Sequence, residues 1–189
     1  MRSFRNLLCA VAALIPLIYS QASHAGQSVP SVGLTEVAFS PGGGAEDLVI
    51  KALHTARREI KLMAYSFTSA NIVRALLAAK KRGVDVAVVV DYKSNIDDSR
   101  SSKSRSALSA LAESGIDVRT LDAFAIAHDK VVIVDAETVQ TGSFNYSASA
   151  EARNSENVLV AWQNPRLAEI YLTHFHRNQR LSKRFVPAY

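Results

Sequence analysis

The sequence predicts an α/β domain in which a mixed, largely parallel β-sheet carries helices on both faces. Short apolar runs typical of strands alternate with segments of helical periodicity between residues 34 and 121. The chain has 189 residues, of which 48% are hydrophobic and 21% are charged, a balance typical of a globular protein with a real core. This length is enough for one domain of ordinary size.

Each predicted element follows from a local pattern. Residues 84–90 are β-branched and nearly all apolar, which predicts a strand buried on both faces. Gly83 and Gly115 each end a segment of helical period. Four residues separate the last two strands before position 143, which predicts a hairpin and therefore a mixed sheet. The expected strands are 34–40, 60–67, 84–90, 117–121, 130–134, 139–143 and 157–162, and the expected helices are 45–58, 71–82, 106–114 and 166–180.

The N-terminus has the pattern of a secretory signal peptide. Two arginines precede an apolar run over residues 7–19, and small residues follow before the expected cleavage site after Ala25, with Ala22 as the alternative. An uncleaved anchor is the other interpretation, but the run is shorter than the roughly 20 residues that span a bilayer. We therefore expect a signal peptide over 1–25 and a single domain over 26–189, periplasmic or secreted and without a stable membrane anchor.

Removal of the signal peptide changes the composition of the chain. The only cysteine, Cys9, is lost, so the mature domain has neither disulfide nor thiol chemistry. Twenty basic and 17 acidic residues remain, which gives a net charge of +3. This charge is compatible with a polyanionic substrate but does not by itself indicate one.

Residues 92–105 stand out as a polar loop without hydrophobic periodicity. A loop of this length in a compact domain is usually functional or mobile. Its cations can contact a phosphate backbone, or they can belong to a solvated surface loop, and the sequence does not decide between these interpretations. The candidate substrate-binding residues are Lys93, Arg100, Lys103 and Arg105.

Residues with catalytic chemistry gather around the predicted hairpin. His128 and Lys130 alternate at the start of a strand, so their side chains are expected on the same face. Ser143 and Asn145 share a face on the partner strand, and Glu156 precedes the next strand. The pattern predicts an imidazole, an ammonium, a hydroxyl, an amide and a carboxylate at one edge of the sheet.

These residues resemble the signature of the phospholipase D superfamily. The pattern His-x-Lys-x-x-x-x-Asp at 128–135 and Gly-Ser-x-Asn at 142–145 is similar to its motif, and segments 64–68, 79–86 and 154–157 are in keeping with it. The resemblance is closer to the short, single-motif bacterial members, the EDTA-resistant secreted endonucleases. It covers nearly the whole mature chain and implies a phospholipase D-like fold.

The resemblance also implies a covalent mechanism. A neutral imidazole at His128 attacks phosphorus and forms a phosphohistidine, which water then hydrolyses. Lys130 and Asn145, assisted by Ser143, stabilise the negative charge that builds up on the non-bridging oxygens. This chemistry needs no metal ion and no other cofactor.

Two acidic residues receive supporting roles. Glu156 is expected to hold the far ring nitrogen of His128 and so to fix its tautomer. Asp135 is interpreted as an orienting or structural acid, because its odd offset from His128 argues against the substrate-facing side.

One catalytic role has no residue in a single chain. The leaving oxygen needs a proton, and the resemblance implies that a histidine from a second copy of the motif donates it. His54, His174 and His176 lie in predicted helices and are poor substitutes. The last two are two positions apart on a helix, so they point apart and do not predict a metal site. A two-fold dimer that brings both copies of His128 to a shared active site supplies the missing acid.

The sequence leaves the substrate open among three hypotheses. The leading one is a nonspecific endonuclease that cleaves DNA, with RNA left open. A lipid phosphodiesterase of phospholipase D type is the alternative, although no amphipathic membrane segment is evident. A catalytically inactive binding module is the third. Basic residues near the C-terminus favour nucleic acid; they are Arg177, Arg180, Lys183 and Arg184.

Overall fold

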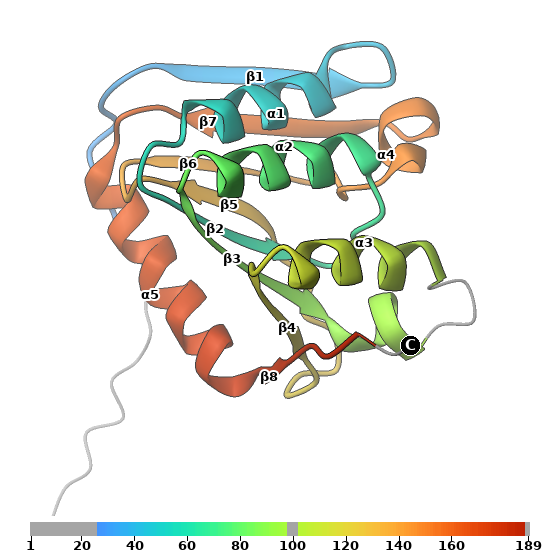
Figure 1. Ribbon diagram of the computed structural model, residues 1–189. Helices are drawn as coiled ribbons and strands as arrows, with labels where there is room; N and C mark the ends of the chain where they lie inside the picture. Colours follow the sequence, from blue (N-terminus) through green and yellow to red (C-terminus); the bar gives the residue numbers. More distant parts are fainter. Residues whose placement is uncertain (1–25, 98–101, 188–189) are drawn as a thin grey trace, which may run out of the picture.

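One eight-stranded sheet runs through the domain in the order β1-β7-β6-β5-β2-β3-β4-β8 (Figure 1). The computed structural model describes residues 26–97 and 102–187. The strands are β1 (Thr35–Ser40), β2 (Glu59–Ala64), β3 (Asp85–Asp91), β4 (Asp117–Leu121), β5 (Lys130–Val134), β6 (Thr138–Gly142), β7 (Glu156–Ala161) and β8 (Lys183–Arg184). The helices are α1 (Ala45–Thr55), α2 (Ala70–Lys81), α3 (Ser102–Glu113), α4 (Ala148–Arg153) and α5 (Pro165–Leu181), and a π-helical turn, η1, spans Lys93–Asp97. The predicted mixed α/β class is confirmed.

The expectation that the sheet is largely parallel is wrong. In the described chain, only β2–β3 and β3–β4 pair in parallel, and the other five pairings are antiparallel. Parallel neighbours need a crossover of a dozen residues or more, and the connection between β5 and β6 is too short for one. Such crossovers occur between β2 and β4, whereas β5 and β6 are joined by a short turn.

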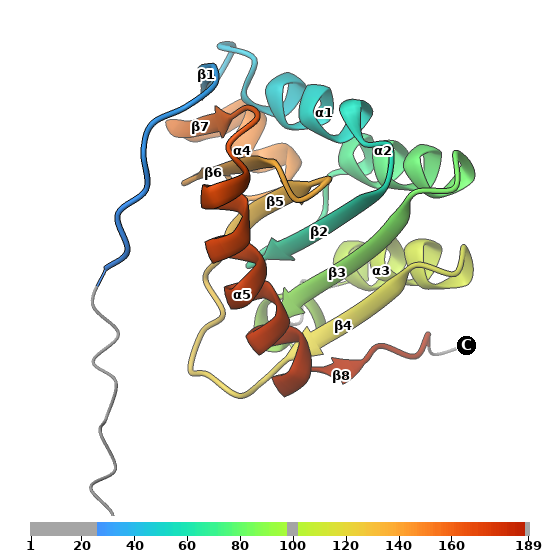
Figure 2. The same cartoon turned by 90° about the vertical axis from the view of Figure 1, so that its left-hand side faces the viewer.

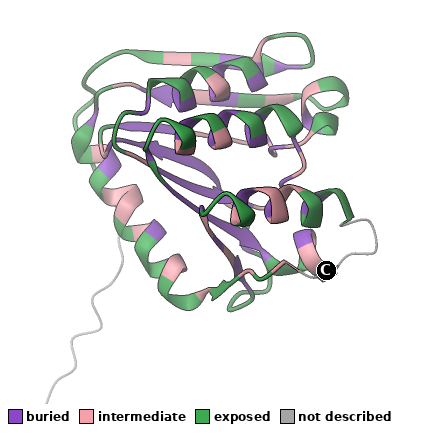
Figure 3. Cartoon of the chain, viewed as in Figure 1, coloured by how far each residue is buried: buried purple, intermediate pink, exposed green. Residues whose placement is uncertain are grey.

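Helices cover both faces of the sheet and create two cores. Helices α1, α2 and α3 lie on one face and α5 on the other, which Figures 1 and 2 show from two sides. The first core contains Phe67, Phe144 and Tyr146. The second contains Met63 and Phe175. The central strands are buried between these layers (Figure 3), as the apolar sequence of β3 predicts.

The polar loop expected over residues 92–105 is partly helical. Residues 93–97 form η1 and residues 102–105 belong to α3, while 98–101 lie outside the described residues. The expectation therefore fails for most of the segment, because polar side chains that contact the backbone locally can stabilise a helical turn without a hydrophobic face. Two further elements, α4 and β8, are too short to give a periodic signal.

The first 25 residues lie outside the described residues, so the signal peptide stays a prediction. Among the helices of the described ranges, none is long and apolar enough to cross a bilayer.

The strand register collects four connecting segments at one edge of the sheet. Lys130 at the start of β5 pairs with Ala64 at the end of β2. Gly142 at the end of β6 pairs with Val158 in β7. The segments that follow β2 and β6 and those that precede β5 and β7 therefore meet at the same edge of the sheet. The catalytic candidates that lie in or next to these segments are His128, Lys130, Ser143, Asn145 and Glu156.

Candidate active site

His128 lies in the segment that leads into β5, and its side chain is exposed. Its ring packs against the ring of Tyr65, with centroids 4.7 Å apart and an angle of 61° between the planes. This edge-to-face contact restricts the imidazole while leaving ring atoms open to solvent. The arrangement suits a nucleophile, which must be held in place and must also reach a substrate.

Lys130 is the buried cation of the site, with 6% of its surface exposed. Its Nζ donates to the backbone oxygen of His128 at 3.0 Å and lies 5.1 Å from the centre of the Tyr65 ring. Burial lowers the pKa of the Lys130 ammonium, and the negative charges of Asp129 and Glu156 partly oppose this shift. A desolvated ammonium interacts strongly with a phosphoryl oxygen.

Glu156 makes contacts that differ from those expected. In the described chain its carboxylate accepts hydrogen bonds from Ser143 Oγ at 2.6 Å and Asn154 Nδ2 at 2.9 Å, and none from His128. The expectation that Glu156 fixes the His128 tautomer is thus not met within one chain. Its charge acts on Lys130 instead.

Ser143 is held in place by three hydrogen bonds. Its hydroxyl donates to Glu156 and accepts from the backbone nitrogen and the Nδ2 of Asn157, at 3.0 and 3.2 Å. A hydroxyl carries one proton, so Ser143 cannot donate to a phosphoryl oxygen while it is bonded to Glu156. The expected assistance from Ser143 would require this bond to break, and the observed geometry favours a role in orienting β6 against β7.

Asn145 follows the end of β6 and is half-buried. Its Oδ1 is buried and has no hydrogen-bond partner among the described residues. With the oxygen turned inward, Nδ2 is the atom available to donate to a substrate oxygen, which agrees with its predicted chemistry.

Two buried polar residues that the sequence analysis did not identify support the site. Asp91, at the end of β3, accepts a hydrogen bond from the backbone nitrogen of Ala127 at 2.8 Å, one residue before the nucleophile. Asn95 donates to the backbone oxygen of Tyr65 at 2.6 Å and accepts from the nitrogen of Phe67 at 3.0 Å. Asp91 therefore anchors the segment that carries His128. Asn95 anchors the segment that carries Tyr65, whose ring packs against the His128 ring. The sequence signal that could have found Asp91 was a polar residue at the end of a buried strand.

His174 lies closer to the site than its helical position suggested. Its Nε2 is 3.1 Å from Oδ1 of Asp129, whose Oδ2 accepts from Asn178 Nδ2 at 3.2 Å. His176 instead faces Gln179, so the two histidines point apart as predicted. Across residues 26–97 and 102–187, no three His, Cys, Asp or Glu side chains gather as a metal site.

Asp135 lies at the opposite end of β5 and does not belong to the site. Its carboxylate accepts hydrogen bonds from the backbone nitrogens of Arg57, Arg58 and Glu59 at 2.8–3.0 Å. Burial alone would raise its pKa, but these donors and the Arg58 charge outweigh burial and lower the pKa of Asp135. Its inclusion among the catalytic residues is corrected to a structural role, since the length of β5 separates it from the substrate edge.

The four candidate substrate-binding cations are dispersed. Lys93 Nζ lies 3.5 Å from the backbone oxygen of Ala125, which brings it close to the nucleophile segment. Lys103 is exposed at the start of α3. Arg105 donates to the backbone oxygen of Ile96 at 2.8 Å. Arg100 lies outside the described residues.

Comparison with known proteins gives the family. The model of a cardiolipin synthase, PLD-like domain matches residues 49–179. The chain belongs to the phospholipase D superfamily. A protein named phospholipase D from Rickettsia typhi is 35% identical over 150 residues, which cover 78% of this chain and 70% of the relative. The chain is thus a phosphodiesterase of this superfamily.

Solved structures give the same fold. The phospholipase D family member Nuc from Salmonella typhimurium is 46% identical, with a TM-score of 0.77, over 80% of this chain and 97% of Nuc. NucT from Helicobacter pylori has a TM-score of 0.68 at 23% identity, over 80% of this chain and 99% of NucT, which supports the fold alone. These structures therefore support a phospholipase D-like fold over about 80% of the chain.

Proposed function

We propose that the protein is an exported, metal-independent endonuclease that cleaves DNA, with RNA as a second substrate, through a phosphohistidine in a dimer-shared site. The observation that carries this proposal is that the exposed imidazole of His128 and the buried ammonium of Lys130 both lie against the ring of Tyr65. An open cavity of about 380 Å³ adjoins His128, and Phe124, Ile126 and Arg177 contribute to its walls. A phosphodiester can reach the nucleophile from this side.

The residues suggest a two-step reaction. A neutral ring nitrogen of His128 forms a bond to phosphorus while the bond from phosphorus to the leaving oxygen breaks, and a general acid protonates that oxygen. Water then attacks the phosphohistidine, gives a proton to the same acid–base group and releases His128. Lys130 and Asn145 Nδ2 stabilise the non-bridging oxygens in both steps.

The general acid is proposed to be His128 of a second copy. Among the described histidines of one chain, His174 lies nearest to the nucleophile segment, but its Nε2 already contacts Asp129. Phe124 and Ile126 are exposed beside His128, with 39% and 56% of their surface accessible. An apolar rim around an exposed nucleophile fits a two-fold contact between identical chains.

The sheet offers a second surface for this contact. Val37 and Phe39 of β1 are both 58% exposed. They point to the sheet face opposite Ala38 and Ser40, and α5 lies over the central strands of that face and leaves β1 open (Figure 2). A second copy packed there would bury apolar side chains that one chain leaves in water.

The nuclease assignment is supported by the 46% identity with Nuc over nearly its whole length. The second candidate, a lipid phosphodiesterase, is favoured by relatives named phospholipase D. Both candidates use the same chemistry at phosphorus, so the substrate assay must separate them.

The test uses purified residues 26–189 in EDTA with plasmid DNA, single-stranded DNA, RNA and phosphatidylcholine vesicles. Cleavage of DNA in EDTA supports the proposal. Strict dependence on Mg²⁺ would refute the metal-independent mechanism, and hydrolysis of the lipid alone would favour the second candidate.

The shared site has its own test. Wild-type and His128→Ala chains are unfolded together at equal concentrations, refolded and assayed. Random pairing leaves about a quarter of the dimers with both histidines. A shared site therefore predicts about one quarter of the activity of wild-type protein at the same total concentration. Activity of about one half, or an active monomer on sizing, would contradict the shared site.

A further inference from the structure

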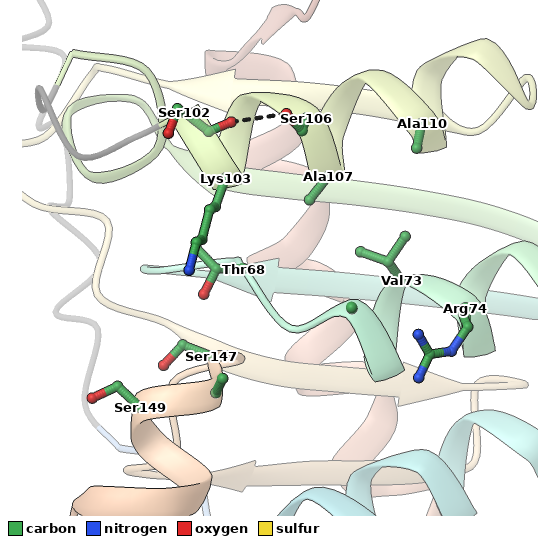
Figure 4. Close-up of a pocket in the computed structure, with 12 residues that line it drawn as sticks. Thr68, Val73, Arg74, Ser102, Lys103, Ser106, Ala107, Ala110, Ser147 and Ser149 are labelled. Carbon is green, nitrogen blue, oxygen red and sulfur yellow. Dashed lines mark hydrogen bonds between the residues drawn. The ribbon is translucent and has the colours of Figure 1, made fainter.

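A second cavity, of about 800 Å³, opens between α2, α3 and the start of α4 (Figure 4). Its inner walls are apolar and built from small side chains, among them Ala70, Val73, Ala107 and Ala110. Because these side chains are small, they leave the space between the two helices unfilled. The result is a groove whose apolar floor can accept a flat or compact apolar group.

The rim of this groove carries positive charge. Arg74 projects from α2 and Lys103 from α3, so the two cations lie on facing walls, and both are exposed. Arg74 donates a hydrogen bond to the uncharged Asn71, and neither cation has an acidic partner in the described ranges. No acidic side chain lines the groove. Such a rim attracts anions.

The groove is connected to the active site through two loops. The segment after β2 contributes Tyr65 to the active site and Thr68 to the groove. The segment after β6 contributes Asn145 to the active site and Ser147 to the groove. The backbone oxygen of Tyr146 accepts hydrogen bonds from the nitrogens of Thr68 and Ser69, at 2.8 and 2.9 Å, which join the two loops. The mouth of the groove is therefore built on the same backbone as the active site.

We propose that this groove binds the part of a polynucleotide strand that lies beyond the scissile phosphate. Lys103 and Arg74 bind phosphates, the hydroxyls of Thr68 and Ser147 donate to phosphate oxygens, and the apolar floor takes a base or sugar. This proposal rests on the proposed function, because a polynucleotide presents a row of phosphates beyond the one that His128 attacks. Phosphatidylcholine has a single phosphodiester, which the nucleophile itself must reach.

The experiment compares a long and a small substrate in EDTA. The long substrate is a single-stranded DNA of about 30 nucleotides, and the small one is bis(p-nitrophenyl) phosphate. The groove variant Arg74→Ala/Lys103→Ala is compared with a matched control, Arg57→Ala/Lys81→Ala. The control removes the same charge from exposed residues at the opposite edge of the sheet, before β2 and at the end of α2. Circular dichroism checks that all variants fold.

The expected result is a change in the ratio of kcat/KM for DNA to kcat/KM for the small diester. The groove variant lowers this ratio about tenfold, whereas the control variant keeps the wild-type ratio. The slope of log kcat/KM for DNA against log salt becomes shallower by about 1.4, since each lost contact to a single strand removes about 0.7.

Several outcomes would overturn the proposal. An unchanged ratio, or an equal fall in the groove and control variants, would refute the groove alone and leave the nuclease in place. A loss confined to hydrolysis of cardiolipin vesicles would assign the groove to lipid. A wild-type protein that hydrolyses the small diester but no polynucleotide would refute the proposed function and this inference with it.

Discussion

The two ends of β5 show how one short motif serves two purposes. At one end, the Lys130 ammonium is buried with a backbone oxygen and an aromatic ring as its neighbours, next to an exposed His128. At the other end, Asp135 accepts three backbone hydrogen bonds and is the better satisfied group. The first end keeps its polar groups available for a substrate, and the second uses its polar group for folding.

This contrast has an energetic consequence. A buried charge with few partners lowers the stability of the fold, whereas a carboxylate with several N–H donors raises it. We therefore expect substitutions at the two ends of β5 to separate activity from stability.

His128→Ala is expected to have the largest effect. Removal of the nucleophile should lower kcat about 10⁴-fold. Because the side chain is exposed, the free energy of unfolding should change by no more than about 0.5 kcal/mol. Steady-state kinetics and urea unfolding measure the two quantities. A variant with near-wild-type kcat would remove His128 from the chemistry.

Lys130→Met is expected to lower kcat by about 10²- to 10³-fold, because it removes a donor to the phosphoryl oxygens. The same variant should be more stable than wild type at neutral pH by about 1 kcal/mol, since a buried ammonium is replaced by an apolar chain of similar size. Thermal unfolding checks the sign. A destabilised variant would show that the Lys130 charge stabilises the fold.

Lys130 also predicts a pH dependence. Its pKa is lowered by burial, and its protonated form is the active one. The alkaline limb of kcat should therefore lie below the pH at which an ordinary lysine titrates. In the folding equilibrium, the cost of the charged form is fully present below the lowered folded-state pKa and disappears as the pH rises from that value to the unfolded-state pKa. A pH–rate profile without an alkaline limb below pH about 10 would contradict the role of Lys130.

Asp135→Ala should affect stability and leave the chemistry intact. Loss of the charge-assisted contacts should cost about 2–3 kcal/mol, while kcat per folded molecule stays near wild type. Because the pKa of Asp135 is lowered, its stabilisation is present above the unfolded-state pKa and is lost as pH falls through the folded-state value. The difference in unfolding free energy between variant and wild type should therefore shrink in acid. A fall in kcat comparable to that of Lys130→Met would return Asp135 to the site.

His174→Ala should give the smallest effect. It removes the contact to Asp129, next to the nucleophile, and should lower kcat about two- to fivefold with little change in KM. His174→Gln keeps a donor near Asp129 and should recover most of the activity. Equal losses in both variants would contradict a positioning role.

Most elements could be predicted from the sequence because their signals are local. Gly83 and Gly115 follow the ends of helices α2 and α3, and they mark where each helix gives way to the next strand. Whether two strands pair in parallel or antiparallel was harder to predict from the sequence, since pairing depends on which segments meet in space. The β1–β7 pair joins segments about 120 residues apart, and no local pattern encodes that contact.

The candidate site also contains residues that could be predicted from the sequence and residues that could not. His128, Lys130 and Asn145 could be identified because they lie close together in the sequence, around two predicted neighbouring strands, in a pattern that resembles the superfamily motif. Asp91, Asn95 and His174 could not, because each is a single polar residue whose partner lies on another element. The direction of the Ser143 hydroxyl bond likewise depends on how β7 is placed against β6.

The central claim is a covalent bond between His128 and phosphorus, and the direct test is to trap it. The protein is quenched in alkali during turnover of DNA labelled at its phosphates, and the peptide that contains residue 128 is analysed by mass spectrometry. The account predicts an alkali-stable, acid-labile phosphohistidine at position 128. Full turnover without a phosphorylated histidine at 128, under conditions that preserve a synthetic phosphohistidine standard, would contradict it.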